Sequence, residues 1–95
     1  MVTGNSPQAL RLLAISVGNT RTSFGVFEGD LLVRADSAPN RDEKALLDAL
    51  LKEARSIEDS ELRAVVAATV NPAFSEKLIE ALEKELDAPV RRVQR

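Results

Sequence analysis

A chain of 95 residues, of which 44% are hydrophobic and 29% charged, has the composition of one small globular domain or of a piece of a larger one. It contains no Cys and no His, which excludes disulfides, Cys/His zinc sites, thiol nucleophiles and imidazole bases. Its net charge of −2 offers no basic face for nucleic acid, and no apolar run approaches the roughly 20 residues that span a bilayer. The first residues carry no secretory signal pattern either, so we expect a cytoplasmic protein that binds neither nucleic acid nor membrane.

The first half of the chain is predicted to be a leader followed by three strands. Residues 1–9 are rich in Gly, Asn, Ser and Pro and are expected to be a flexible leader before one subdomain over residues 10–95. The apolar run Leu10–Val17 predicts a strand covered on both faces, as in the centre of a sheet. Apolar and polar side chains alternate over residues 21–27, and a Gly-Asp hairpin leads to a third strand over residues 31–36, which predicts an antiparallel meander.

The second half is predicted to alternate helices and strands. Asn40 is expected to cap the first helix, with Glu43 reaching back in a capping box, and a buried strand follows over residues 62–70. Asn71-Pro72 predicts the start of a second helix, and a short final strand is expected over residues 89–93. The order β-β-β-α-β-α-β predicts an α/β fold, with helices packed on a mixed five-stranded sheet. The apolar face of the first helix is predicted to consist of Leu47, Leu50, Leu51 and Ala54, with Leu46 at its edge.

The turn between the first two strands is the most informative candidate site. Gly18, Asn19 and Thr20 can present backbone N–H groups and a hydroxyl to a phosphate, although Gly and Asn are also ordinary turn residues. Thr22 has two equal interpretations, as a hydroxyl donor to phosphate and as an ordinary strand threonine. Arg21 is interpreted first as a solvated strand residue, with a phosphate contact as the alternative.

The ordered set of motifs resembles the first half of a type III pantothenate kinase, in the superfamily of acetate and sugar kinases, heat-shock ATPases and actin. That family opens on Asp-x-Gly-Asn-Thr with a Gly a few residues later. Here the window reads Ser16-Val17-Gly18-Asn19-Thr20, with Gly25 downstream. Residues 24–30 are similar to the family's second strand and hairpin, and residues 65–72 to its strand-to-helix junction. The resemblance covers nearly all of residues 10–94 and implies a ribonuclease H-like half-domain of the actin-like ATPase superfamily.

The resemblance also implies a function. The family's enzymes transfer the γ-phosphate of ATP to pantothenate, which begins coenzyme A synthesis, with ATP and Mg²⁺ as cofactors and a monovalent cation as a further option in the intact enzyme. It implies that Gly18, Asn19, Thr20 and Thr22 bind nucleotide phosphate. Pantothenate would bind only with the family's second half, which supplies its pocket, the general-base Asp and further nucleotide segments, and whose motifs do not occur here. An isolated half exposes apolar surface, which leaves homodimerisation open.

Ser16 departs from the family's pattern. The Asp of the family motif is held to bind the Mg²⁺ that bridges the phosphates, and a neutral hydroxyl lacks the charge that anchors a hard cation. The simpler interpretation of Ser16 is a small residue tolerated near a strand end, and the alternative is a hydrogen bond to a metal-bound water or a phosphate. We therefore expect that this chain alone is not a competent kinase.

Three functions stay open on the sequence. The first is the nucleotide-binding half of a type III pantothenate kinase-like protein. The second is a non-catalytic binding or transcription-accessory module of the Bvg accessory factor type. The third is another member of the wider superfamily that acts on a different sugar or acid.

Overall fold

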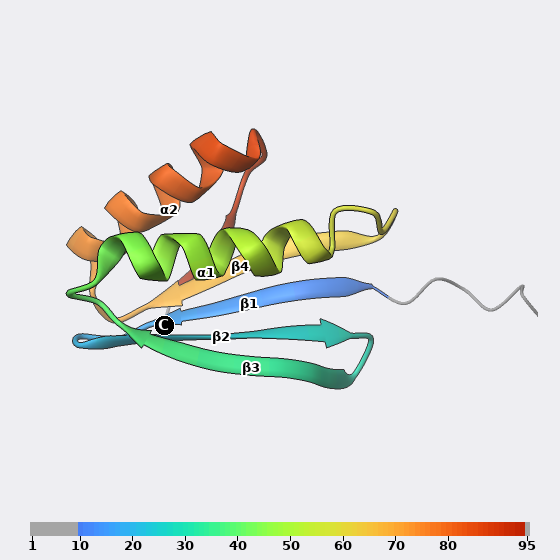
Figure 1. Cartoon of the computed structure of the whole chain (residues 1–95), viewed down its shortest axis with the longest axis horizontal. Helices are drawn as coiled ribbons and strands as arrows, with labels where there is room; N and C mark the ends of the chain where they lie inside the picture. Colours follow the sequence, from blue (N-terminus) through green and yellow to red (C-terminus); the bar gives the residue numbers. More distant parts are fainter. Residues whose placement is uncertain (1–9, 95) are drawn as a thin grey trace, which may run out of the picture.

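The structure, a computed structural model, describes residues 10–94, and its helices and strands follow the predicted order (Figure 1). The predicted leader over residues 1–9 lies outside the described residues. The strands are β1 (Arg11–Val17), β2 (Arg21–Glu28), β3 (Leu31–Pro39), β4 (Arg63–Thr69) and β5 (Arg91–Gln94). The helices are α1 (Glu43–Ser56) and α2 (Pro72–Leu86).

The five strands form one mixed sheet in the order β3-β2-β1-β4-β5. β1 pairs antiparallel with β2, and β2 with β3, which confirms the predicted meander. β4 pairs in parallel with β1 on one side and with β5 on the other. β3 runs three residues beyond its predicted end, because Pro39 still pairs with Arg21. The predicted α/β fold with a mixed five-stranded sheet is confirmed.

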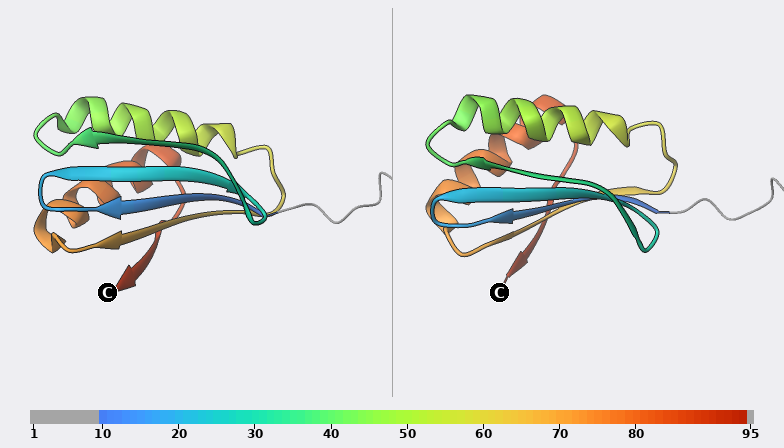
Figure 2. Two further views of the ribbon diagram at one scale, coloured as in Figure 1. Left: turned by 90° about the horizontal axis from the view of Figure 1, so that it is seen from below. Right: turned by 60° about the horizontal axis from the view of Figure 1, so that its bottom comes forward.

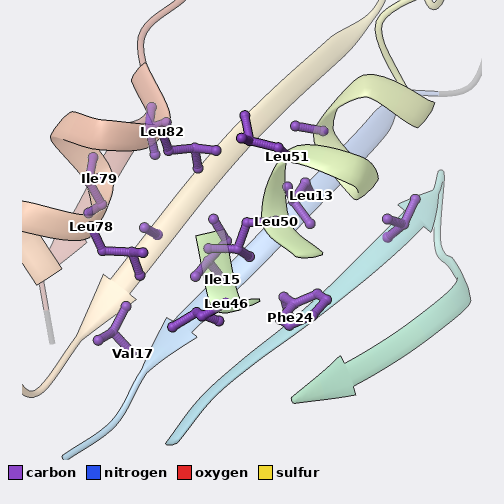
Figure 3. Packing of buried hydrophobic residues seen from close by; sticks show 14 of the residues in the cluster. Leu13, Ile15, Val17, Phe24, Leu46, Leu50, Leu51, Leu78, Ile79 and Leu82 are labelled. Atoms are coloured by element: carbon purple, nitrogen blue, oxygen red, sulfur yellow. The ribbon is translucent and has the colours of Figure 1, made fainter. Parts of the chain in front are cut away.

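Both helices pack on the same face of the sheet (Figure 1). β3 and β4 run in parallel, as do β4 and β5, and both connections step in the same direction across the sheet. Right-handed crossovers therefore place α1 and α2 on one side. The apolar side chains of the two helices meet those of β1 and β2 in a single core (Figure 3).

The core differs from the prediction in the rotation of α1. Leu46 is fully buried and Leu47 only half-buried, so the predicted edge residue lies at the centre of the contact. In α2, Ile79 is buried although its place on the apolar face was not predicted. The contact between α1 and α2 explains both residues, because a helix with two neighbours buries a wider stripe than a helix with one.

The other face of the sheet is not covered by either helix, so the prediction that β1 is covered on both faces is wrong for the described chain. Leu13, Ile15 and Val17 are buried against the helices, whereas the alternate residues Ala14 and Ser16 are half-buried on the opposite face. Figure 2 brings this face forward, with the strands in front of α2. An open groove of about 800 Å³, lined mostly by apolar atoms, runs along it.

The two helices begin differently from the prediction. Asp42, and not Asn40, is the N-cap of α1, and its side chain accepts a hydrogen bond from the N–H of Ala45. Asn71 stands at the N-cap position of α2 with Pro72 as the first helical residue, as predicted, but its side chain makes no capping hydrogen bond. Both asparagine side chains instead point toward the carbonyl of Gly18 at the end of the sheet.

An ion-pair network joins β5 to α2. Arg92 donates to the carboxylate of Glu76 and to both carboxylate oxygens of Glu83, and the Oε2 of Glu83 also accepts from the N–H of Val90 at 2.8 Å. The hydrogen bonds from Arg92 and then from Val90 hold the pKa of Glu83 below its ordinary value. Within residues 10–94, neither helix is long and apolar enough to cross a membrane.

Candidate functional site

Three connections meet at one end of the sheet, on the left of Figure 1: the β1–β2 turn, the β3–α1 loop and the β4–α2 junction. The N–H of Asn40 donates to the carbonyl of Thr20 at 2.8 Å, and the N–H of Val70 donates to the carbonyl of Val17 at 3.1 Å. The β1–β2 turn is therefore tied to both of its neighbours through the main chain. The candidate residues Gly18, Asn19 and Thr20 all lie on this turn.

Gly18 is required by the shape of the turn. Its N–H donates to the carbonyl of Arg21 at 2.9 Å. A Cβ atom at position 18 would lie 2.8 Å from that same carbonyl oxygen, a distance that real side chains do not adopt. Glycine is required here because the backbone of Arg21 comes so close. A positive φ is not the reason, since among the glycines of the described chain that conformation occurs at Gly29.

Two asparagine side chains hold the turn from either side. The Nδ2 of Asn40 donates to the carbonyl of Gly18 at 2.8 Å, and the Nδ2 of Asn71 approaches the same oxygen at 3.5 Å. The Oδ1 of Asn40 accepts from the hydroxyl of Thr22 at 2.7 Å. Asn40 is 8% exposed and Thr22 is fully buried, so this bond is shielded from water. These contacts explain why Asn40 does not cap α1.

Thr22 therefore lies at the site without facing solvent. Its hydroxyl is already committed as a donor to Asn40, and its side chain points to the helix-covered side of the sheet with Phe24 and Val26. Asn19 and Thr20, in contrast, are exposed at the tip of the turn. Within residues 10–94, no hydrogen bond uses the backbone N–H of Asn19 or of Thr20. These two N–H groups are available to an anion, as a phosphate-binding turn requires.

A shallow depression of about 480 Å³ lies beside the turn. The ionisable residues that line it, Arg21 and Arg41, are both cationic. Arg21 comes from the start of β2, and its guanidinium donates to the hydroxyl of Ser37 at 3.0 Å. Arg41 comes from the loop between β3 and α1. The surface around Asn19 and Thr20 is therefore electropositive.

Ser16 faces the other side of the turn, toward the open groove. In the register of the sheet, Ser16 pairs with Ser23, and Ser23 pairs with Ser37. Three hydroxyl-bearing residues from β1, β2 and β3 thus form a row across the end of the sheet, and all three line the groove. We refer to Ser16, Ser23 and Ser37 as the serine row.

The residues present do not fit a divalent metal site. Mg²⁺ is held by hard, charged oxygen ligands, usually carboxylates, and position 16 supplies only a neutral hydroxyl. Across residues 10–94, no three His, Cys, Asp or Glu side chains are grouped so that they could hold a metal ion. Asp36, an acidic residue at the groove, already accepts a hydrogen bond from the N–H of Ser37. The structure therefore gives no step through a metal at Ser16.

Sequence reasoning located the turn but missed its supports. It singled out Gly18, Asn19 and Thr20, which the structure places together at one tip, and it assigned Asn40 to helix capping. Arg41 was not singled out at all. The available signal was topological: the carboxyl ends of β1 and β3 and the starts of both helices lie at the same end of the sheet, so residues 39–41 had to lie near the turn.

Comparison with known proteins decides the family. The sequence profile described as type III pantothenate kinase matches residues 12–95. The chain belongs to the type III pantothenate kinase family. It is 35% identical over 80 residues to a type III pantothenate kinase of Moorella thermoacetica, an alignment that covers 79% of this chain and 32% of the relative. The chain thus spans about a third of the length of the curated relative it matches.

Solved structures with the same fold include enzymes with other activities. A ROK hexokinase from Thermus thermophilus matches with a TM-score of 0.61 at 21% identity, over 90% of this chain and 34% of that chain. A Ppx/GppA family protein from Aquifex aeolicus matches with a TM-score of 0.54 at 12% identity, over 90% of this chain and 35% of that chain. At these identities the likeness shows the fold alone, and each solved chain is about three times as long as the part that matches.

Proposed function

We propose that residues 10–95 are the N-terminal, ribonuclease H-like subdomain of a type III pantothenate kinase-like protein, and that the subdomain binds the phosphates of a nucleotide. In the whole protein the reaction would be transfer of the γ-phosphate of ATP to pantothenate, the first step of coenzyme A synthesis. Family membership over residues 12–95 supports the reaction, and the 32% of the relative that is covered supports the assignment to one part of a longer protein. A cytoplasmic location and homodimerisation stay predictions.

The observation that carries the proposal is the β1–β2 turn. Its tip presents the unused N–H groups of Asn19 and Thr20, while Gly18 keeps the backbone close and Asn40 fixes its carbonyl. A turn fixed in this way loses little conformational freedom when it binds a phosphate, which favours binding. In this proposal Asn19 and Thr20 contact the phosphate. Thr22 contributes by positioning Asn40, because its hydroxyl is buried and already donates to that residue.

Ser16 sets the limit on activity. Phosphoryl transfer depends on positioning and on the stabilisation of charge by metal ions and cationic groups. A serine at the position of the family's metal-binding Asp removes that anchor, and the loss of such stabilisation is worth several kcal/mol. We expect that this chain alone binds nucleotide weakly and does not transfer phosphate.

The same residue favours the second candidate function. A kinase-derived module that has lost its metal-binding carboxylate can keep its fold and serve as a non-catalytic binding or transcription-accessory protein of the Bvg accessory factor type. Ser16 and the lack of a metal-binding group within residues 10–94 support this alternative. It differs from the first proposal in predicting no nucleotide binding at the turn.

Titration with ATP separates the two functions. We would measure binding by isothermal titration calorimetry with and without Mg²⁺, for the unchanged chain and for Ser16→Asp. The matched control is Ser23→Asp, which places the same charge one strand away in the serine row. We expect Ser16→Asp to gain Mg²⁺-dependent ATP binding and Ser23→Asp to gain none. No binding of ATP at millimolar concentration by any of the three would contradict the nucleotide-binding proposal and support the non-catalytic module.

A further inference from the structure

The depression beside the turn carries two cations that nothing else in the described chain neutralises. It is lined by Asn19, Thr20, Arg21, Pro39, Asn40 and Arg41. No carboxylate lines it, and within residues 10–94 neither arginine has an ion-pair partner. The printed partner of Arg21 is the uncharged hydroxyl of Ser37. Two guanidinium groups with no counter-charge thus border the exposed tip of the turn.

Three other arginines of residues 10–94 form ion pairs, whereas Arg55, Arg63 and Arg91, like Arg21 and Arg41, form none. Arg11 pairs with Glu28, Arg34 pairs with Glu53 at 2.8 Å, and Arg92 pairs with two glutamates of α2. A chain with fifteen acidic residues and thirteen basic ones has enough carboxylates for every cation. Arg21 and Arg41 differ from the remaining unpaired arginines in that both line one depression, beside the exposed residues Asn19 and Thr20.

The acidic residues next to Arg41 are committed to other partners. Asp42 caps α1 through the N–H of Ala45, and Glu43 pairs with Lys77 of α2. Neither of these carboxylates lines the depression. The guanidinium of Arg41 is therefore available to an anion from solution.

We propose that Arg21 and Arg41, with the free N–H groups of Asn19 and Thr20, form an oxyanion site that binds a polyphosphate without a metal ion. The inference rests on the proposed function in placing a phosphate at the turn, and it deepens it by naming the source of positive charge. Guanidinium groups present several N–H donors in a planar fork and bind phosphate oxygens in pairs, which a point charge does not. The residues around Ser16 do not fit a divalent cation. At this site the two arginines supply the positive charge that such a cation would otherwise bring.

Ser16 fits the same inference. A carboxylate at position 16, without a cation to balance it, would repel a phosphate bound at the adjacent turn. The neutral hydroxyl removes that repulsion. We therefore expect Ser16→Asp to weaken polyphosphate binding in the absence of metal, opposite to its expected effect with Mg²⁺.

The test is a titration of the full chain with inorganic triphosphate in EDTA. Binding is measured by calorimetry and, in a parallel titration, by two-dimensional amide NMR. Arg21→Gln and Arg41→Gln are each expected to raise the Kd about 3- to 10-fold and the double variant more than about 10-fold, since tenfold corresponds to the loss of one charged contact. The control is Arg55→Gln, which removes the same charge in the last turn of α1, away from the turn. It should change the Kd less than about twofold, because exposed charges beyond a Debye length are screened.

The outcomes separate this inference from the proposed function. If triphosphate binds the double arginine variant as tightly as the unchanged chain, or binds only with Mg²⁺, the arginine site is wrong, whatever ATP does. If triphosphate binding depends on the arginines but neither triphosphate nor Mg²⁺-ATP shifts the amide signals of Asn19 and Thr20, the proposed function is wrong, and so is the part of this inference that assigns the two N–H groups to the site. Shifts at both amides that persist in EDTA and shrink in Arg21→Gln and Arg41→Gln support both.

Discussion

The buried hydrogen bond between Thr22 and Asn40 gives a direct test of how the turn is held. The hydroxyl of Thr22 donates to the Oδ1 of Asn40 at 2.7 Å, with the threonine fully buried. Thr22→Val keeps the shape of the side chain and leaves that oxygen without its donor. A buried polar atom left unpaired costs about 1–3 kcal/mol. Because Asn40 is 8% exposed and can recruit some water, we expect about 1–2 kcal/mol.

Asn40→Ala should cost more than Thr22→Val. It removes the same hydrogen bond, strands the Thr22 hydroxyl in the core, and also removes the 2.8 Å bond to the carbonyl of Gly18. Two lost bonds and one stranded hydroxyl give about 2–4 kcal/mol. In the double variant the shared bond is counted once, so the double-mutant cycle should show a coupling of about 1–2 kcal/mol.

The assay is urea unfolding followed by far-ultraviolet circular dichroism, since the chain has no Trp or Tyr to report by fluorescence. In thermal unfolding followed by the same signal, each kcal/mol lost should lower the Tm by about 4–8 °C for a domain of this size. Thr20→Val is the control, because Thr20 is exposed at the tip of the same turn and should change stability by less than about 0.5 kcal/mol. A coupling near zero, or an equal loss in Thr20→Val, would refute the role assigned to the Thr22–Asn40 bond.

Three further predictions concern stability. Gly18→Ala places a Cβ 2.8 Å from the carbonyl oxygen of Arg21 and should cost about 1–3 kcal/mol in urea unfolding. Ser75→Ala should stabilise the protein by about 0.5–1.5 kcal/mol, because the fully buried Ser75 hydroxyl has no hydrogen-bond partner among residues 10–94 and alanine is a better helix former. Glu83→Gln should cost about 1 kcal/mol at pH 7 through the weakened pairing with Arg92. Because the pKa of Glu83 is lowered from 4.5 in the fold, this contribution is complete above about pH 4.5 and is lost as the pH falls through the lower value, so unfolding profiles of the two proteins should converge in acid.

Matched controls make these three measurements interpretable. Asn19→Ala changes an exposed residue of the same turn as Gly18 and should have little effect. Ser23→Ala removes an exposed serine hydroxyl and should not stabilise the protein as Ser75→Ala does. Glu85→Gln removes an exposed carboxylate of α2 that has no ion pair within residues 10–94, and it should leave the acid sensitivity intact. A stabilisation by Ser23→Ala equal to that of Ser75→Ala, or an acid profile altered by Glu85→Gln, would contradict the reasoning.

The fold could be predicted because its signals are local. Alternation along β2, the hairpin glycine and the Asn-Pro helix start each depend on neighbouring residues, and they gave the element order and the meander. The coverage of β1 could not be predicted in the same way. An apolar run such as Leu10–Val17 signals burial but does not say which face the helices take, and Ala14 and Ser16 are small enough to lie on an open face.

The candidate site was predictable only in part, for a related reason. Gly18, Asn19 and Thr20 are adjacent in sequence, so a turn motif reveals them. Asn40 lies 22 residues after Gly18 and satisfies a capping-box pattern with Glu43. The pattern failed because the partners of Asn40 come from the β1–β2 turn and from β2, where the carbonyl of Gly18 accepts from it and the buried hydroxyl of Thr22 donates to it, while Asp42 caps the helix instead. The long-range hydrogen bonds of Asn40 outweigh its local preference for capping the helix, because the neighbouring Asp42 can take over the capping role.

The charges around the turn separate binding from catalysis. With Ser16, the positive charge at the turn comes from Arg21 and Arg41 and needs no cation, whereas a carboxylate at position 16 with a divalent cation would add a net positive charge to theirs. Either arrangement attracts a phosphate to the N–H groups of the turn. A metal ion also bridges phosphate oxygens and neutralises charge as it develops on the transferred group, which arginines fixed beside the turn do only if they reach that group. A chain with Ser16 and the two arginines should therefore bind polyphosphate without transferring it, and Ser16→Asp should weaken this metal-free binding while adding Mg²⁺-dependent ATP binding.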